Sequence, residues 1–485
     1  MSRPPLPAWL LLAVAVLGFA AATLGVAVPA TDGQRAAVDE TQYLLTALSI
    51  AEDGDLDISD ELAFQRWRSF ADEAPPQQTA IRADGSAISP HDPLLPLLLA
   101  WPVSVGGWLG AKVALACLAG LLAAVLLWTA VRRFGVPVPL AAGGVAIAAA
   151  SAPLAVYGQQ LYPELPAALL ILCAVALLAG PPSRAGLAGL VTVLATVPWL
   201  SVKYVPVLAV LALLGAWRWR GQAGQLAAAG GVLAAAGAAY LAVHRAVWGG
   251  WTVYASGDHF VERGGEFAVV GDEVDLSGRA LRITGLLLDR DYGLVAWQPA
   301  YLLVVPAVGA LGAVVVLAVR GRRRSVRVPA SSPVPDEWPV RPTGLDERAT
   351  RAVVLLVPLT AGWLVATFVA STMHGFWWPG RHVVAVLPLA VLAILVWLTD
   401  AGRATRLVAL VAGLAGVAVY AVLLVAGRTS GFTWVLGLDV VSLPWRVLLP
   451  DYRGGYGLLH ACWLILLLGL IGSVLLHPDH LRSKR

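Results

Sequence analysis

The chain has 485 residues, of which 58% are hydrophobic and only 13% are charged. A typical soluble domain carries about 25% charged residues, so this composition excludes a soluble protein. Only helices or closed barrels satisfy their backbone in lipid, and the long apolar runs predict an all-α, multi-pass membrane protein. All three cysteines fall within apolar runs, which argues against disulfides and against a zinc site.

About twelve apolar stretches reach or approach the length of a membrane span. They predict one transmembrane domain over 1–485 with both chain ends on the same side of the membrane. The stretch from Pro198 to Pro206 is the least regular, because Trp199, Ser201 and Lys203 interrupt it. We expect the spans at 9–28, 108–131, 136–157, 163–180, 186–200, 203–217, 224–244, 299–319, 352–371, 383–399, 406–426 and 457–476.

The basic residues predict the orientation. Arg132, Arg133 and the arginines of 320–327 lie in connections that the positive-inside rule assigns to the cytoplasm. The long loops 30–107, 245–298 and 427–456 are then extracytoplasmic, and 320–351 is a cytoplasmic linker rich in Arg, Pro and Ser that we expect to lack regular structure. The absence of Asn and the scarcity of Lys indicate a GC-rich bacterium, which suggests a plasma (inner) membrane location.

The first loop, 30–107, predicts helices that lie at the membrane surface. Asp39 stands three residues before Gln42, as in a capping box, and an apolar face follows at helical spacing. Asp53-Gly54-Asp55 predicts the turn that ends this helix. Further amphipathic pieces are expected over 60–70 and 93–105, and the second of these is too short to span the membrane.

Acidic residues next to apolar spans are the candidates for chemistry. Asp39 and Glu40 follow the first span, and Glu164 begins a later one, where an acid at membrane depth is expensive. The structural alternative is that each acid caps a helix or stabilises the N-terminus of a helix through the helix dipole. Residues 53–57 resemble a calcium loop only in part, because the EF-hand needs Gly and Glu where Ile58 and Phe64 stand, and a solvated turn is favoured there.

Cationic and aromatic residues lie at the same expected face. The cations are Lys203, Arg290, Arg381 and His382, and each of them has snorkelling to lipid headgroups as its alternative. Trp377 and Trp378 are adjacent, which is also typical of an interfacial belt. The sequence contains no Gly-rich phosphate loop and no hydrolase or zinc-protease motif.

The arrangement resembles the GT-C superfamily of integral-membrane glycosyltransferases. That group includes protein mannosyltransferases, the aminoarabinose transferase that acts on lipid A, and actinobacterial mannosyl- and arabinosyltransferases. The resemblance rests on the topology and on short motifs: Asp39-Glu40, His91-Asp92-Pro93, Tyr162-Pro163-Glu164, Lys203, Asp291-Tyr292-Gly293 and Trp378-Pro379-Gly380-Arg381-His382. The Arg-rich linker has no place in the family pattern.

The resemblance implies transfer of a sugar from a polyprenyl-phosphate donor to a hydroxyl of a cell-envelope glycan, glycolipid or protein. Asp39 would then be the general base with Glu40 next, and Glu164 would orient the acceptor or the base, or help to hold a metal. Lys203, Arg290, Arg381 and His382 would bind the donor phosphate. His91, Tyr292, Trp377 and Trp378 are the candidates for contacts with the sugar or the acceptor. The resemblance establishes no cofactor, and it leaves a divalent metal ion open.

Two other classes of function compete with this interpretation. A transporter or flippase of a lipid-linked or small solute also suits about twelve spans, with acids at helix ends as proton relays. The long acidic loop and the lack of internal repeats argue against it. A receptor or structural membrane protein is the third class, and no feature of the sequence favours it.

Overall fold

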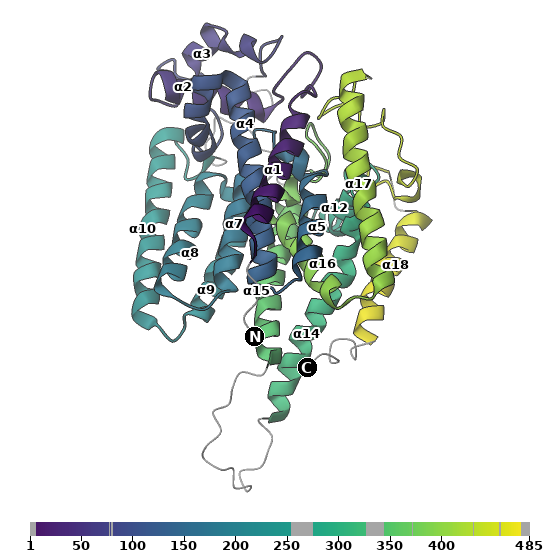
Figure 1. The fold of residues 1–485 in the computed structure, drawn as a ribbon. Coiled ribbons are helices and arrows are strands. Elements are labelled where there is room, and N and C mark those ends of the chain that lie inside the picture. The colour runs from purple at the N-terminus through teal and green to yellow at the C-terminus, as the bar shows by residue number, and fades with distance from the viewer. Residues whose placement is uncertain are drawn as a thin grey trace.

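The computed structural model describes residues 6–76, 78, 81–253, 275–325, 344–370, 372–429, 431–454 and 457–476. Helices dominate these residues, and the only β contacts among them are two isolated bridges, Thr31 with Gln34 and Asp57 with Ile88. The all-α prediction is therefore confirmed for the described part of the chain (Figure 1).

Each predicted span overlaps a helix of the main bundle, although some of these helices, such as the helix Val138–Ala149, are shorter than the span that was predicted. Seven of the described segments are long and apolar enough to cross a membrane, and shorter apolar helices pack among them, so the chain is a multi-pass membrane protein. The bundle helices are α1 (Ala8–Gly25), α4 (Leu94–Arg132), α5 (Val138–Ala149), α7 (Glu164–Leu178), α8 (Arg184–Thr196), α9 (Val205–Arg218), α10 (Ala223–Trp248), α14 (Val304–Ser325), α15 (Gly344–Leu364), α16 (Leu387–Asp400), α17 (Arg403–Thr429) and α18 (Leu458–Leu476).

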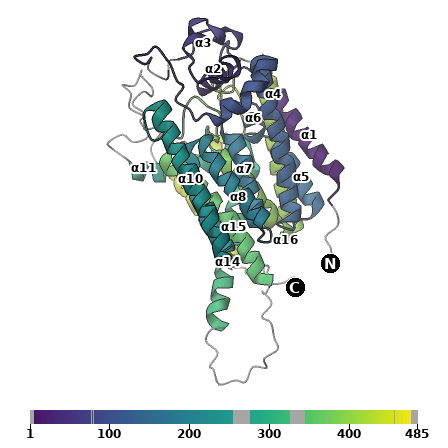
Figure 2. The same cartoon turned by 90° about the vertical axis from the view of Figure 1, so that its left-hand side faces the viewer.

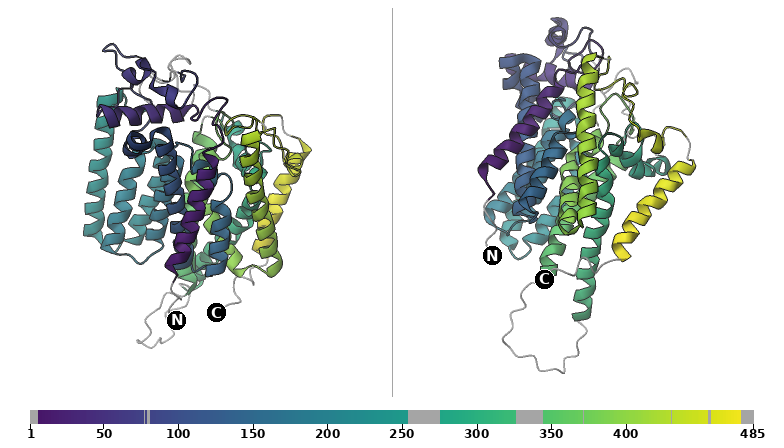
Figure 3. Two further views of the ribbon diagram at one scale, coloured as in Figure 1. Left: turned by 45° about the horizontal axis from the view of Figure 1, so that its top comes forward. Right: turned by 45° about the vertical axis from the view of Figure 1, so that its right-hand side comes forward.

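The first loop forms a separate layer at one end of the bundle. Helices α2 (Asp39–Glu52) and α3 (Ser59–Ala63) lie there, while α1 begins and α18 ends toward the opposite end (Figure 1). The views in Figures 2 and 3 show the same layer above the bundle, and α2 packs on α4. We refer to this side as the α2 end.

Short elements connect the bundle helices and shape the α2 end. They are α6 (Leu154–Tyr157), α11 (Leu276–Ala280), α12 (Arg282–Leu288), α13 (Leu294–Trp297), the 3-10 turns η1 (Arg66–Ser69), η2 (Val197–Trp199), η3 (Val202–Tyr204), η7 (Pro299–Leu303), η9 (Arg381–Val386) and η10 (Arg446–Leu448), and the π-turn η8 (Val365–Val369). Turns η2 and η3 lie between α8 and α9, where polar residues were seen to interrupt the apolar pattern.

Two details of the loops differ from the prediction. The segment 320–351 is helical at both ends, since α14 continues to Ser325 and α15 begins at Gly344. The expectation of no regular structure is wrong there because charged residues such as Arg and Glu are good helix formers; residues 326–343 lie outside the described part. The piece predicted over 60–70 is also split into α3 and η1, with Gln65 at a φ of 55° between them.

Helix α4 has two arms that meet at Gly107. This residue has φ 56° and ψ −149°, and the first arm, 94–106, is the short amphipathic piece that was predicted. The arm leaves large apolar side chains uncovered, with Leu97 58%, Trp101 74% and Val105 72% exposed. Because this face repeats at helical spacing, we expect it to rest against the lipid.

Gly107→Ala is expected to destabilise the protein by about 1–3 kcal/mol, because the backbone conformation at the kink is almost restricted to glycine. A Cβ there would meet open space, so the loss comes from the backbone alone. The free energy of unfolding in detergent measures it. Gly106→Ala is the matched control, since Gly106 also has open space and no positive φ. Equal stability of the two variants would contradict the argument.

Candidate active site

Asp39 is the first residue of α2 and does not cap it. The residue before the helix is Val38, at φ 50° and ψ −114°, and no side chain caps this end. Instead, the carboxylate of Asp39 accepts hydrogen bonds from Arg381 Nη2 at 2.8 Å and from Gln78 Nε2 at 3.3 Å. The capping-box interpretation with Gln42 is therefore wrong, because distant parts of the chain bind the side chain that a local cap would have used.

Glu40 points into a different network from its neighbour. Its side chain is fully buried, and its oxygens accept hydrogen bonds from the backbone N–H groups of Ala37 at 3.0 Å and Leu161 at 2.8 Å. Lys112 of α4 completes the network, with its ammonium 3.3 Å from Glu40 and 3.0 Å from the side-chain oxygen of Gln159. Glu40 thus fastens the start of α2 to the bundle.

Glu164 begins α7 and is 1% exposed. One oxygen, Oε1, accepts from Lys203 Nζ at 2.7 Å and from Arg381 Nε at 3.0 Å. The other oxygen, Oε2, is buried and has no hydrogen-bond partner among the described residues. A buried carboxylate oxygen without a partner is costly, so it marks a place where a ligand group would be stabilised.

Arg381 joins the two acids. It follows Gly380, whose φ of +85° turns the chain into η9, and its guanidinium binds Asp39 and Glu164 at once. The same group lies 4.0 Å from the ring centroid of Tyr162 and 5.4 Å from that of Trp377. We call Asp39, Glu164, Lys203 and Arg381 the quartet; its formal charges balance, and it assembles α2, α7, η3 and η9 at one point.

The quartet is buried yet not sealed. The side chains of Asp39, Arg381 and Lys203 are 13%, 11% and 23% exposed. Burial by itself would raise the pKa of Asp39, but the charge of Arg381, together with its hydrogen bond and that of Gln78, outweighs burial and lowers the pKa to about 2. Asp39 is therefore an ionised and weakly basic carboxylate while Arg381 is bound to it.

The stability difference between the wild type and Asp39→Asn is expected to shrink in acid. A pKa lowered from 3.8 to about 2 corresponds to about 2 kcal/mol of stability. That contribution is complete above pH 4 and is lost as the pH falls from about 4 to about 2, where the wild-type carboxyl becomes protonated. Unfolding of both proteins in detergent across this range measures it, and a constant difference would contradict the ion pair.

His91 is linked to Asp39 of the quartet by the side chain of Gln78, which contacts both residues. Its Nε2 lies 3.1 Å from Gln78 Oε1, and its ring stacks on Tyr43 at 4.5 Å. Burial is the main cause that lowers the pKa of His91, so the imidazole is neutral near pH 7. The next residue, Asp92, accepts hydrogen bonds from Tyr240 at 2.8 Å and His244 at 2.9 Å, both on α10, and from the backbone N–H of Val202 in η3 at 3.2 Å.

The structure places several of the other predicted residues elsewhere. Trp378 is fully buried and packs on Trp297 with ring centroids 4.9 Å apart, so it is a core residue. Arg290 donates to the backbone of Leu449, and Tyr292 to that of Gly375. Both belong to a second polar cluster that is built around Asp289, which also contacts His374 and the backbone of Tyr452.

Trp377 and His382 lie beside the quartet. Their rings meet edge to face with centroids 5.2 Å apart, and Trp377 also covers Arg381. The Nε2 atom of His382 is buried and has no hydrogen-bond partner in the described structure. This atom and Glu164 Oε2 are polar groups on which a bound ligand could be held.

Sequence analysis missed three residues of this region. Tyr162 was part of a motif but was not assigned to the site, and Gln78 lies in a loop with no local signal at all. Lys112 could have been found, because a lysine within a membrane span is a functional or structural candidate by default.

The quartet does not suit a divalent metal ion. Both of its acids are already bound to a lysine or an arginine, which leaves Glu164 Oε2 as the one carboxylate oxygen shown without a partner there. Cations of the calcium or magnesium class take six or more oxygen ligands. The one group of acids in the described residues that could hold a metal lies elsewhere.

Comparisons with known proteins give one structural similarity. No family model matches the sequence, and no curated protein matches it. The chain is similar to ArnT from Cupriavidus metallidurans, whose crystal structure contains bound undecaprenyl phosphate, with a TM-score of 0.49 and 15% sequence identity over 97% of this chain and 74% of that chain. At this level of similarity the function has to be derived from the side chains of this protein.

Proposed function

We propose that the protein is a membrane glycosyltransferase that moves a sugar from a polyprenyl-phosphate donor to a hydroxyl of an extracytoplasmic acceptor. The observation that carries the proposal is the quartet, which places two carboxylates and two cations together at largely buried but partly exposed positions. The proposal agrees with the resemblance of the sequence to the GT-C superfamily. It also implies that the α2 end faces the extracytoplasmic side of the plasma membrane.

The two cations supply what a leaving phosphate needs. Lys203 and Arg381 meet at Glu164 Oε1, so both positive groups point at one location. As the bond between the anomeric carbon and the phosphate oxygen breaks, the phosphate gains negative charge, and fixed cations in a buried site stabilise that charge. Polyprenyl phosphate then leaves as the second product.

Asp39 is the proposed general base. The acceptor hydroxyl attacks the anomeric carbon, its proton passes to Asp39, and the glycosidic bond forms as the phosphate departs. With a pKa of about 2, Asp39 is a poor base while it is bound to Arg381. When the donor phosphate takes a share of the positive charge of Arg381, Asp39 becomes more basic, so donor binding prepares the base. This single displacement inverts the anomeric centre.

The remaining groups would position the sugar and the acceptor. Glu164 Oε2 and His382 Nε2 have no partner among the described residues and would hold sugar or acceptor hydroxyls. Trp377 offers an aromatic face beside Arg381, and His91 contacts the base through Gln78. Glu40 acts indirectly, because it fixes the peptide that carries Asp39.

A turnover assay tests the proposal. Purified wild type and Asp39→Asn are incubated with a panel of radiolabelled polyprenyl-phosphate sugars and candidate acceptors, and sugar release and transfer are measured. The wild type is expected to consume at least one donor. Asp39→Asn is expected to lose about a hundredfold or more, since general-base catalysis contributes about 10²–10⁴-fold.

The controls separate loss of chemistry from loss of fold. Asn is close to Asp in size, so Asp39→Asn should still bind donor when binding is measured at equilibrium. If both proteins turn over a donor equally, Asp39 is not the base. If the wild type consumes no donor with any acceptor but moves a lipid-linked or small solute across vesicles, the transporter alternative replaces the enzyme.

A further inference from the structure

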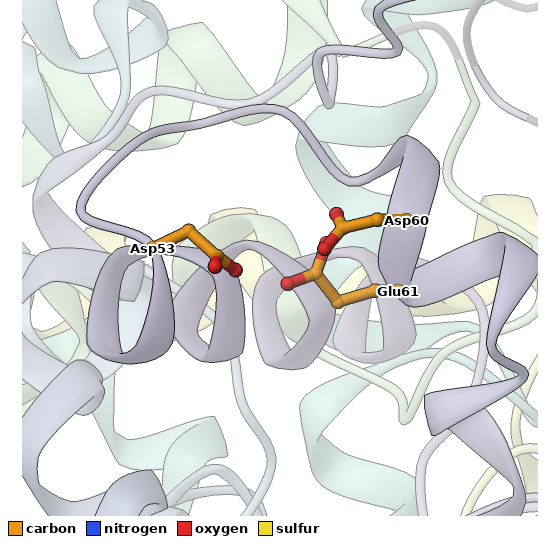
Figure 4. Close-up of side chains that lie close together, drawn as sticks. All are labelled: Asp53, Asp60 and Glu61. Atoms are coloured by element: carbon orange, nitrogen blue, oxygen red, sulfur yellow. The ribbon is translucent and has the colours of Figure 1, made fainter.

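Three carboxylates lie together where α2 ends and α3 begins. Asp53 directly follows α2, and Asp60 and Glu61 belong to the first turn of α3. One oxygen from each lies within 4.8 Å of the others, and Figure 4 shows the three carboxyl groups converging. Helix α2 has 14 residues, so at about 1.5 Å per residue this cluster lies about 20 Å along the helix from Asp39. It is separate from the quartet.

Glu61 is the unusual member of the cluster. Asp53 and Asp60 are exposed, but Glu61 is only 1% exposed. Its Oε2 atom is buried and has no hydrogen-bond partner among the described residues, and its carboxyl group reaches toward Asp53 and Asp60 (Figure 4). A cation bound between the three carboxyl groups would satisfy this buried oxygen.

The described basic side chains do not provide that partner. Arg66, on the following turn, is held by Glu52 through both guanidinium nitrogens, one of them at 2.6 Å from Glu52 Oε1. No ion pair joins a basic side chain of the described residues to Asp53, Asp60 or Glu61. Arg66 is near enough to act on Asp53 and Glu61 through its charge, but its hydrogen bonds go to Glu52, so no described basic side chain binds the three carboxyl groups directly.

The neighbouring acids Asp55 and Asp57 bind groups of their own loop instead. Asp55 Oδ1 accepts from the Ser49 hydroxyl at 2.8 Å and from the backbone N–H of Asp57 at 2.9 Å. Asp57 in turn accepts from the backbone of Ser59 and Ala87. These two residues build the turn, so the ligand set differs from the 53–57 loop that the EF-hand comparison had considered.

We propose that Asp53, Asp60 and Glu61 form a binding site for a divalent cation of the calcium class. The donor set consists of carboxylate oxygens alone, which hard cations prefer. Calcium binds oxygen at about 2.3–2.6 Å and can bridge ligand atoms that are nearly 5 Å apart, and water completes its six to eight ligands. The bound ion joins the end of α2 to α3. With three protein ligands the site has low affinity, with a Kd of about 10⁻⁴–10⁻³ M.

Equilibrium binding of ⁴⁵Ca²⁺ to the full-length protein, purified in detergent and stripped with a chelator, tests the site. The wild type is expected to bind one saturable ion in this range. Glu61→Gln and Asp53→Asn are each expected to weaken binding more than about tenfold, because even residues behind the ligands cost 10–100-fold in metal sites. Asp53 is exposed, so Asp53→Asn tests the site without disturbing the core.

Asp84→Asn is the matched control from the same loop. Asp84 is exposed, binds only Ser86 in the hydrogen bonds shown, and should leave calcium binding unchanged. A wild type that binds no calcium up to about 10 mM, well above the expected Kd range, overturns the proposal. Equal binding by the wild type and Asp53→Asn overturns it too, because the ion would then lie elsewhere. Sugar-transfer activity does not enter this test, so the result is independent of the proposed function.

Discussion

Arg381→Gln is expected to lower kcat by about 10²–10³-fold. The loss of one fixed donor to a developing charge costs that much in well-studied enzymes, and Arg381 binds both acids of the quartet. Gln keeps some hydrogen bonding but removes the charge that the leaving phosphate needs. Rates of sugar transfer at saturating donor measure the effect, and KM for the donor should also rise.

Two further variants show whether the loss is local. Arg282→Gln changes a partly buried arginine of α12 that donates to the backbone of Ala370, and its kcat should stay within about threefold of the wild type, as for a residue that makes no contact with the reacting groups. Arg290→Gln tests the second polar cluster. If Arg290→Gln loses as much activity as Arg381→Gln, the phosphate binds at the second cluster and the mechanism above is wrong.

Lys112→Met is expected to destabilise the protein by about 3–5 kcal/mol, which is the usual cost of removing one partner of a buried ion pair. Lys112 is 2% exposed and Glu40 is fully buried, so the substitution leaves an unpaired carboxylate in the interior. Thermal or denaturant unfolding in detergent measures the loss. Activity should fall as well, because Glu40 fixes the peptide that carries Asp39.

The double variant Glu40→Gln with Lys112→Met is the control for charge. It removes both charges, so it should recover a large part of the stability that Lys112→Met alone loses. Glu40 accepts from the backbone N–H groups of Ala37 and Leu161 through different oxygens, so the single amide oxygen of Gln can keep one of these two hydrogen bonds. If the two losses simply add, the pair does not couple, and the anchoring role of Glu40 has to be abandoned.

The sequence was sufficient to predict the bundle because a span is a local property. A run of about twenty apolar residues can be recognised in one sequence without knowledge of its neighbours in space, and each expected span overlaps a helix. The separate helical arm at 94–106 and the turn at Gly54, with φ +81°, followed from equally local patterns. Local reasoning failed at the ends of 320–351, where composition suggested a linker but α14 and α15 continue.

The site could be predicted only as a set of candidates. Asp39 and Arg381 are 342 positions apart in the chain, and nothing in one sequence states that two such distant residues meet. The same limit explains the capping error, since a capping box is a pattern of four consecutive residues whereas Asp39 binds the distant Arg381. Trp377 and Trp378 looked equivalent in sequence, yet one covers Arg381 and the other packs in the core.

His91 and Asp92, just before α4, restrict the number of residues that the chain can have between this dipeptide and the exposed face of the first arm of α4. The side chain of His91 contacts Gln78, and that of Asp92 binds α10. Leu97, Trp101 and Val105 are exposed on the arm that follows. Adding or removing a single residue between Asp92 and Leu97 rotates the arm by about 100° relative to the dipeptide. Related chains should therefore vary in side chains here but not in residue number, and an insertion found between these positions would count against the coupling.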